Sequence, residues 1–192
     1  EGGHHDVHAN RIYTYLPAAQ RLCLFHAAWE VKSFIDSWVH KDGLLLLAHH
    51  VGAFLVSSVC MQPVYHTYVC YFLGLSELSS IPLPIVAMLD ETLGLGPPGL
   101  GKQLPILKNI SSISFAVLFM TVRVVIWIVI ASKYFEDGLA VVHGSFCKSE
   151  PIIWFYLVAM GLFTLLQLVW AVDLVRAVYE FLVPKPVDKQ KG

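Results

Sequence analysis

The sequence predicts an all-α fold, a polytopic integral membrane helix bundle with about five transmembrane helices. Three features predict this class. Apolar residues make up 56% of the 192 residues, which is about 108, and five spans of roughly 20 residues need about 100. Asp, Glu, Lys and Arg make up only 14% of the chain, against about 25% in an ordinary soluble domain. Residues 43–76 contain none of these four residue types.

The same composition restricts the partners. A net charge of −1 and a pI near 6.8 leave no basic face to neutralise phosphates, so nucleic acid is excluded as a partner. Membrane lipids are the expected partners, with other membrane subunits as an alternative. The four cysteines have no metal-ligand spacing, and we expect no metal and no cofactor. The predicted organisation is a polar N-terminal segment (1–11), a membrane domain (12–183) and a polar C-terminal tail (184–192).

The first apolar stretch, residues 12–40, is interrupted by charged residues that include Glu30, Lys32 and Asp36. It is interpreted as a span whose polar residues face the bundle. The alternative is an amphipathic helix that lies flat at the interface. Lys32 and Asp36 are four residues apart and can pair on one helix face. Asp36 is close to the expected helix end and is predicted to be a structural residue at the membrane boundary.

Proline and glycine divide the remaining chain. Pro63 breaks the long uncharged run because proline removes a backbone donor and disfavours helix in the preceding residue, and Pro82 and Pro84 predict a broken or kinked end for the second helix. A dense group of Gly and Pro residues indicates a connecting loop. The predicted elements are helices over 43–61 and 64–81, a loop over 90–109, and helices over 110–135 and 152–183.

His49 and His50 lie within an apolar run. Adjacent helical positions diverge by about 100°, so this pair alone is not expected to form a metal site. One imidazole is a candidate general base or nucleophile, with a nearby carboxylate to fix its tautomer. The alternative is a pair of neutral histidines that hydrogen-bond between helices.

Glu77 and Arg123 are each the only formal charge in the middle of a predicted helix, and we expect them to pair facing inward. His66 shares a helical face with Glu77, since residues 66, 70, 73 and 77 follow the i, i+4, i+7, i+11 stripe. The pair is either a structural ion pair that locks two helices or part of a substrate site.

Short motifs in a fixed order resemble the TLC domain. Translocating-chain-associated membrane proteins, ceramide synthases and a set of small lipid-associated proteins share this domain, and the resemblance runs from about Phe34 to Trp170. Its segment at Glu77 is most similar to the small branch that lacks ceramide synthase activity. The motifs are Lys41-Asp42 followed by His49-His50, the segment 77–82, Arg123 after Phe119, and the segment 165–170.

The resemblance implies roles for these residues. Ceramide synthases join a fatty acyl-coenzyme A to a sphingoid base, with the double histidine as acyl acceptor or base, so His49 and His50 are the candidate catalytic residues. Ser76-Glu77 stands where those enzymes have a histidine-aspartate pair, and Ser80 stands where a second aspartate lies. One glutamate thus replaces a carboxylate pair. The expected lipid or substrate cavity is lined by His66, Glu77, Ser80 and Arg123, and Trp170 is expected to be a structural polar residue.

These patterns predict a membrane protein that binds lipid or acts in membrane lipid homeostasis. One alternative is a ceramide-synthase-like acyltransferase, which would be a sphingoid-base N-acyltransferase. The other is a non-catalytic accessory subunit of a larger organellar membrane complex. We expect the endoplasmic reticulum membrane as the location, with a mitochondrial or plastid membrane as the alternative if a targeting segment has been removed.

Overall fold

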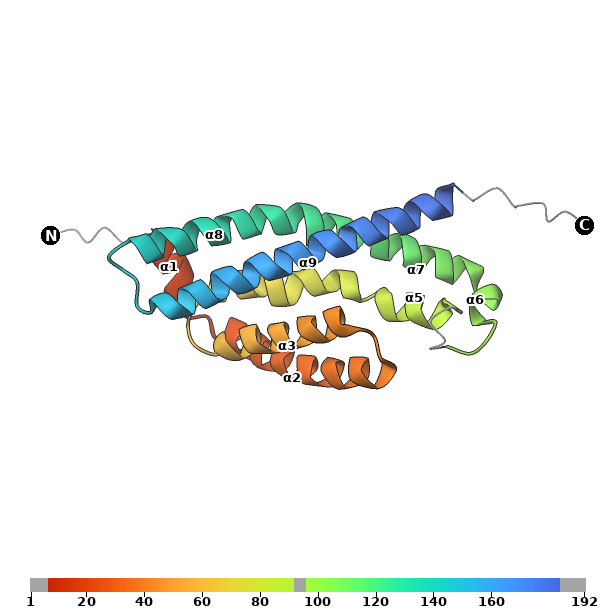
Figure 1. Ribbon diagram of the computed structural model, residues 1–192, viewed down its shortest axis with the longest axis horizontal. Coiled ribbons are helices and arrows are strands. Elements are labelled where there is room, and N and C mark those ends of the chain that lie inside the picture. The colour runs from red at the N-terminus through yellow and green to blue at the C-terminus, as the bar shows by residue number, and fades with distance from the viewer. Residues whose placement is uncertain (1–6, 92–95, 184–192) are drawn as a thin grey trace, which may run out of the picture.

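The computed structural model describes residues 7–91 and 96–183, and every regular element in these ranges is a helix. The helices form an elongated bundle, with α1 (Val7–Tyr13) at one end and the last turns of α9 (Glu150–Leu182) at the other (Figure 1). The predicted tail over 184–192 and residues 1–6 of the predicted N-terminal segment lie outside the described residues. The predicted all-α class is confirmed.

The stretch predicted as one helix over 12–40 consists of two, because the chain is extended at Leu16 and α2 (Pro17–His40) begins anew. Proline suits the first position of a helix, where the missing N–H has no partner to lose. Lys41 and Gly43 then adopt positive φ angles of 59° and 98°. They reverse the chain, so that α3 (Leu44–Val59) returns along α2 (Figure 1).

The predicted break at Pro63 is confirmed, because no helix includes residues 60–65. Tyr65 lies in this turn with a φ of 61°, and its N–H donates to the carbonyl of Ile12 at 2.6 Å, which ties the turn to α1. The next helical stretch is irregular, and it breaks again at Pro82 as predicted. Its parts are α4 (His66–Val69), the π-helical η1 (Cys70–Gly74), the 3₁₀-helical η2 (Leu75–Ser80) and α5 (Leu83–Leu89).

The helix predicted over 110–135 is longer at both ends, and the loop predicted over 90–109 is wrong in its later part. The cause is again a proline at the first position of a helix, here Pro105. The elements are α6 (Leu100–Gln103), α7 (Pro105–Leu118), the π-helical η3 (Phe119–Ile126) and α8 (Trp127–His143). From Pro105 to His143 these form one unbroken helical stretch.

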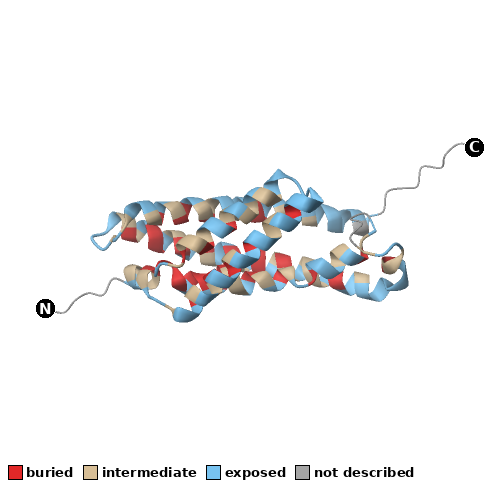
Figure 2. Ribbon diagram, turned by 90° about the horizontal axis from the view of Figure 1, so that it is seen from below, coloured by how far each residue is buried: buried red, intermediate tan, exposed pale blue. Residues whose placement is uncertain are grey.

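Among the described residues, three helical stretches are long and apolar enough to cross a membrane: His66–Leu89, Pro105–His143 and Glu150–Glu180. The segment Leu44–Val59 is a shorter apolar helix. Buried residues lie where helices face one another, and exposed residues lie on the outside (Figure 2). Many of the exposed side chains are large and apolar, and Ile106, for example, is 74% exposed. The integral membrane helix bundle is therefore confirmed, whereas the number of five spans stays a prediction.

One expectation for α2 is wrong. Glu30 faces the bundle, with 6% of its side chain exposed, but Lys32 and Asp36 point outward, with 61% and 52% exposed. The buried face of α2 includes Cys23, His26 and Glu30, at the spacing of one helical stripe. Positions 32 and 36 fall on a different face. Their predicted pairing with each other is confirmed.

Candidate functional site

Arg123 and Glu77 form an ion pair at the centre of two membrane-length helices. The Nη2 atom of Arg123 lies 2.6 Å from Oε1 of Glu77. Arg123 is midway along Pro105–His143, and Glu77 is midway along His66–Leu89. A charge at this depth costs at least about 2.5–3.5 kcal/mol on insertion scales. The pairing predicted from the sequence is confirmed, and it offsets this cost for both residues.

Three serines of η2 complete the arginine cluster. Nε of Arg123 donates to Oγ of Ser79 at 2.8 Å and to the carbonyl of Ser76 at 3.2 Å. Nη2 also donates to Oγ of Ser80 at 3.0 Å, and this hydroxyl donates to Oε2 of Glu77 at 2.9 Å. A 3₁₀ helix has three residues per turn, so positions 76 and 79, like 77 and 80, lie one above the other. The 3₁₀ geometry of η2 therefore brings together the acceptors that bind the guanidinium of Arg123.

The arginine comes from an equally irregular segment. It lies in η3, a π-helical stretch, and π turns within α-helices occur frequently at functional sites. The hydroxyl of Tyr71 donates to the carbonyl of Val122. This bond satisfies a backbone acceptor and joins η1 to η3. The packing of η1 and η2 against η3 thus fixes the position of Arg123.

A second polar cluster lies where α2 packs against α3. Nδ1 of His50 lies 2.7 Å from Oε2 of Glu30, and Nε2 of His26 lies 3.4 Å from Oε1 of the same carboxylate. The hydroxyl of Ser57 donates to the carbonyl of Ala53, so Nδ1 of His26 is the donor in its 2.9 Å bond with that hydroxyl oxygen. Each oxygen of Glu30 therefore faces an imidazole nitrogen, and one of these imidazoles is itself held in place.

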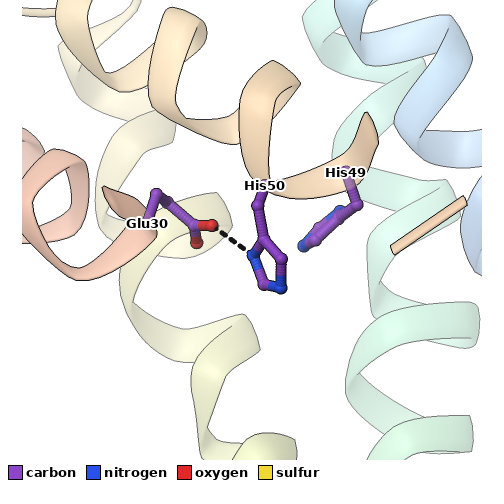
Figure 3. A group of neighbouring side chains, drawn as sticks. All are labelled: Glu30, His49 and His50. Atoms are coloured by element: carbon purple, nitrogen blue, oxygen red, sulfur yellow. Dashed lines mark hydrogen bonds and ion pairs between the residues drawn. The ribbon is translucent and has the colours of Figure 1, made fainter. Parts of the chain in front are cut away.

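His49 lies beside His50 and is held by aromatic contacts. Figure 3 shows Glu30 reaching from α2 to His50, with the His49 ring on the opposite side of His50. The two imidazole centroids are 5.3 Å apart, and His49 meets the rings of Phe163 and Trp170 edge-on at 5.5 and 5.2 Å. Its Nδ1 atom is buried without a hydrogen-bond partner. A buried polar atom of this kind costs about 1–3 kcal/mol, which makes it a candidate ligand-binding group.

A comparison with protein-family models matches residues 7–176 to the TLC domain. This chain belongs to the TLC-domain family. The family is linked to lipid metabolism and sensing. Searches of curated proteins and of solved structures returned no match to the chain. The resemblance from Phe34 to Trp170 is thereby confirmed at the level of the family, whereas membership of the small branch stays a prediction.

The histidine cluster between α2 and α3 is also lined by α9, the last helix of this TLC domain. Phe163, Gln167 and Trp170 follow an i, i+4, i+7 spacing on α9, and the first and last of them contact His49. Gln167 between them is only 2% exposed, and its Oε1 atom has no hydrogen-bond partner. α9 therefore adds a second unpartnered polar atom, Oε1 of Gln167, to the histidine cluster.

The structure does not bring every predicted site residue to these clusters. His66 is fully buried, and both its ring nitrogens bond to backbone: Nδ1 accepts from the N–H of Leu16 at 3.1 Å, and Nε2 donates to the carbonyl of Cys60 at 2.8 Å. It fastens the turn after α3 to the start of α2. Asp36 is exposed beside Lys32. Glu77, Ser80 and Arg123 do lie together.

Sequence reasoning did not identify Glu30 as the partner of His50. The available signal was the spacing of His26 and Glu30, four residues apart in an apolar stretch. It also missed Asp137, which is fully buried and lies 2.8 Å from Nη2 of Arg11, with the hydroxyl of Tyr68 donating to it. This ion pair ties α1 to α8 in the TLC domain. An aspartate next to Glu136, just beyond the predicted helix over 110–135, gave little indication of it.

Proposed function

We propose that this TLC-domain protein binds a membrane lipid and acts in membrane lipid homeostasis. The observation that carries the proposal is a pair of buried polar atoms without partners, Nδ1 of His49 on α3 and Oε1 of Gln167 on α9. Buried polar groups in proteins are almost always hydrogen-bonded. A lipid that offers hydroxyl or amide groups would supply the missing bonds, and its acyl chains would lie along the apolar outer faces.

The arginine cluster supports the same proposal. η3, which carries Arg123, packs against α9, and Phe163 and Trp170 of α9 contact His49, so the arginine cluster supports a helix that lines the proposed headgroup site. The Nη2 atom of Arg123 is engaged by Glu77 and Ser80. The expected role of Arg123 is therefore to hold the helices around the headgroup in place.

The test is purification in mild detergent followed by lipid mass spectrometry. We expect one lipid class to be enriched over its abundance in the source membrane. His49→Phe and Gln167→Leu should each lower that enrichment, because each replaces a side chain that carries an unpartnered polar atom with an apolar one of similar size. Arg176→Ala, on the exposed part of α9, is the matched control and should leave the enrichment unchanged. Wild-type protein with no enriched lipid would overturn the proposal.

A second candidate function is acyl transfer, and the bond between Glu30 and His50 favours it. A carboxylate that orients an imidazole is the usual arrangement for a general base. The amine of a long-chain base would attack the thioester carbonyl of an acyl-coenzyme A and lose its proton to His50, and the carbon–sulfur bond would break to release the coenzyme A thiol. Incubation with both substrates tests this function. Product that is lost in His50→Ala would favour the acyltransferase.

Two further expectations belong to the same proposal. Endoplasmic reticulum is the proposed location, and fractionation of cells that express the tagged chain against markers for mitochondria and plastids tests it. A role as a non-catalytic subunit of a larger complex predicts co-migration with that complex on a native gel. A small oligomer with bound lipid would favour lipid binding instead.

A further inference from the structure

Glu30, His49 and His50 present metal-ligating atoms to one another. One ligand atom from each residue, a carboxylate oxygen and two imidazole nitrogens, lies within 4.8 Å of the other two. Glu30 comes from α2 and the histidines from α3, and Figure 3 shows the three side chains grouped. We propose that these residues bind one divalent transition-metal ion, and that this ion is zinc. The metal site is argued from the geometry of these three residues alone, although it shares His49 with the proposed lipid site.

The arrangement overcomes the divergence of adjacent helical positions. Successive residues on a helix point about 100° apart, so the double histidine alone was not expected to form a metal site. In the structure the His50 ring leans to α2, where it meets Glu30, and the His49 ring leans to α9, yet their centroids stay 5.3 Å apart. The third ligand therefore comes from the neighbouring helix, which the sequence alone did not indicate.

The ligand types favour zinc. Zinc in enzymes is commonly held by three protein ligands drawn from histidine and acidic residues, with bonds of about 2.0–2.2 Å and a fourth position left open. Small rotations of the three side chains would bring their ligand atoms to such bonds. The ion would take the place of the hydrogen bond between Glu30 and His50, and its positive charge would compensate a carboxylate buried in an apolar helix pair. It would also provide a partner for the imidazole of His49.

The surroundings match those of a metal site. Ligands to bound metals are normally oriented by a second layer of hydrogen bonds. Here His26 faces the carboxylate of Glu30 and is itself held by Ser57. Phe163 and Trp170 cover the other side of His49 and would limit access of water. Both features keep the ligand atoms close together before an ion arrives.

Zinc binding to the full chain in detergent tests the proposal. Protein stripped with a chelator is titrated with Zn²⁺ against a chromophoric competitor, and the retained metal is measured by mass spectrometry. We expect about one zinc per chain for three protein ligands. Glu30→Gln, His49→Phe and His50→Gln each remove one ligand while preserving size, and each should weaken binding by about 100-fold, at the upper end of the loss seen for outer-shell residues. His40→Gln, at the exposed end of α2, is the matched control and should bind as wild type.

A second measurement keeps the test valid where a variant folds poorly. Wild-type protein loaded with Co²⁺ should show visible d–d absorption that added Zn²⁺ abolishes, and Zn²⁺ but not Mg²⁺ should raise the thermal midpoint reversibly. Wild-type protein that retains no zinc, or ligand variants that fold and bind zinc as tightly as His40→Gln, would overturn the proposal. Lipid content is measured on the same samples. Loss of zinc with unchanged lipid would support the metal site and separate it from the lipid function.

Discussion

The two polar clusters of this membrane domain differ in how completely their hydrogen bonds are made. In the arginine cluster, Arg123 donates to a carboxylate, two hydroxyls and a carbonyl. In the histidine cluster, Oε2 of Glu30 bonds to His50 and Oε1 lies 3.4 Å from Nε2 of His26, but Nδ1 of His49 has no partner. Both clusters lie among apolar helices, where an unmade bond is costly. The first arrangement favours stability, whereas the second leaves a group available to a ligand.

This difference indicates that the arginine cluster mainly stabilises the fold and that the histidine cluster mainly binds a ligand. The ion pair between η2 and η3 holds two central helices in register, and the Nε and Nη2 atoms of Arg123 are already engaged by η2. An unpartnered imidazole reduces stability unless something binds to it. Substitutions in the first cluster should therefore damage folding, and substitutions in the second should damage binding with little loss of folding. The predictions that follow test this division in order of decreasing effect.

The largest effect is expected for Arg123→Ala. Removing one partner of a buried ion pair leaves the other uncompensated and costs about 3–5 kcal/mol, and the lower end of this range is expected here because 39% of the Glu77 side chain is exposed. Arg176→Ala is the matched control, since Arg176 pairs with Asp173 at 3.7 Å with 68% and 63% of the two side chains exposed. It should cost less than about 1 kcal/mol. Thermal unfolding of both variants in the same detergent measures the difference, and equal midpoints would contradict the structural role of the pair.

A smaller effect is expected when Glu77 is changed, and its size depends on the replacement. Glu77→Gln keeps an oxygen that can accept from Arg123, whereas Glu77→Ala leaves the guanidinium without its main acceptor. The alanine variant should be less stable than the glutamine variant by about 1–3 kcal/mol, the usual cost of an unsatisfied buried group. Chemical or thermal unfolding of the two variants side by side measures this. If the two were equally stable, the carboxylate would not be holding Arg123.

His49→Phe should raise the stability of the ligand-free protein, whereas the two preceding substitutions lower it. Phenylalanine keeps the edge contacts with Phe163 and Trp170 and removes the unpartnered Nδ1 atom, so ligand-free protein should gain up to about 1 kcal/mol, the lower part of the cost of such an atom. The same variant should lose lipid and zinc binding. Thermal unfolding of chelator-treated, delipidated protein measures the gain, with His40→Phe as control. A clear loss of stability would show that His49 serves the fold.

The sequence predicted the helices and the central ion pair for physical reasons that act locally. Apolar runs and prolines locate helices, and a single charge in the middle of each of two membrane-length segments has few other partners than the other charge. The bond between Glu30 and His50 was not predictable in this way, because it depends on how α2 and α3 align after the turn at Lys41. The π and 3₁₀ geometry around Arg123 also arises from packing, since no sequence pattern distinguishes it from regular helix.

The smallest effect is expected for the exposed pair on α2. Lys32 and Asp36 are in contact but mostly exposed, near the turn that ends at Gly43. If this turn lies at the membrane boundary, water screens the pair, and its coupling should be below about 0.5 kcal/mol, as for surface pairs four residues apart. A double-mutant cycle of Lys32→Ala and Asp36→Ala measures the coupling, and the cycle of Arg123→Ala and Glu77→Ala gives the buried reference. A coupling as large as that reference would place the two residues in lipid and would show that α2 extends deeper into the bilayer than its charged residues indicate.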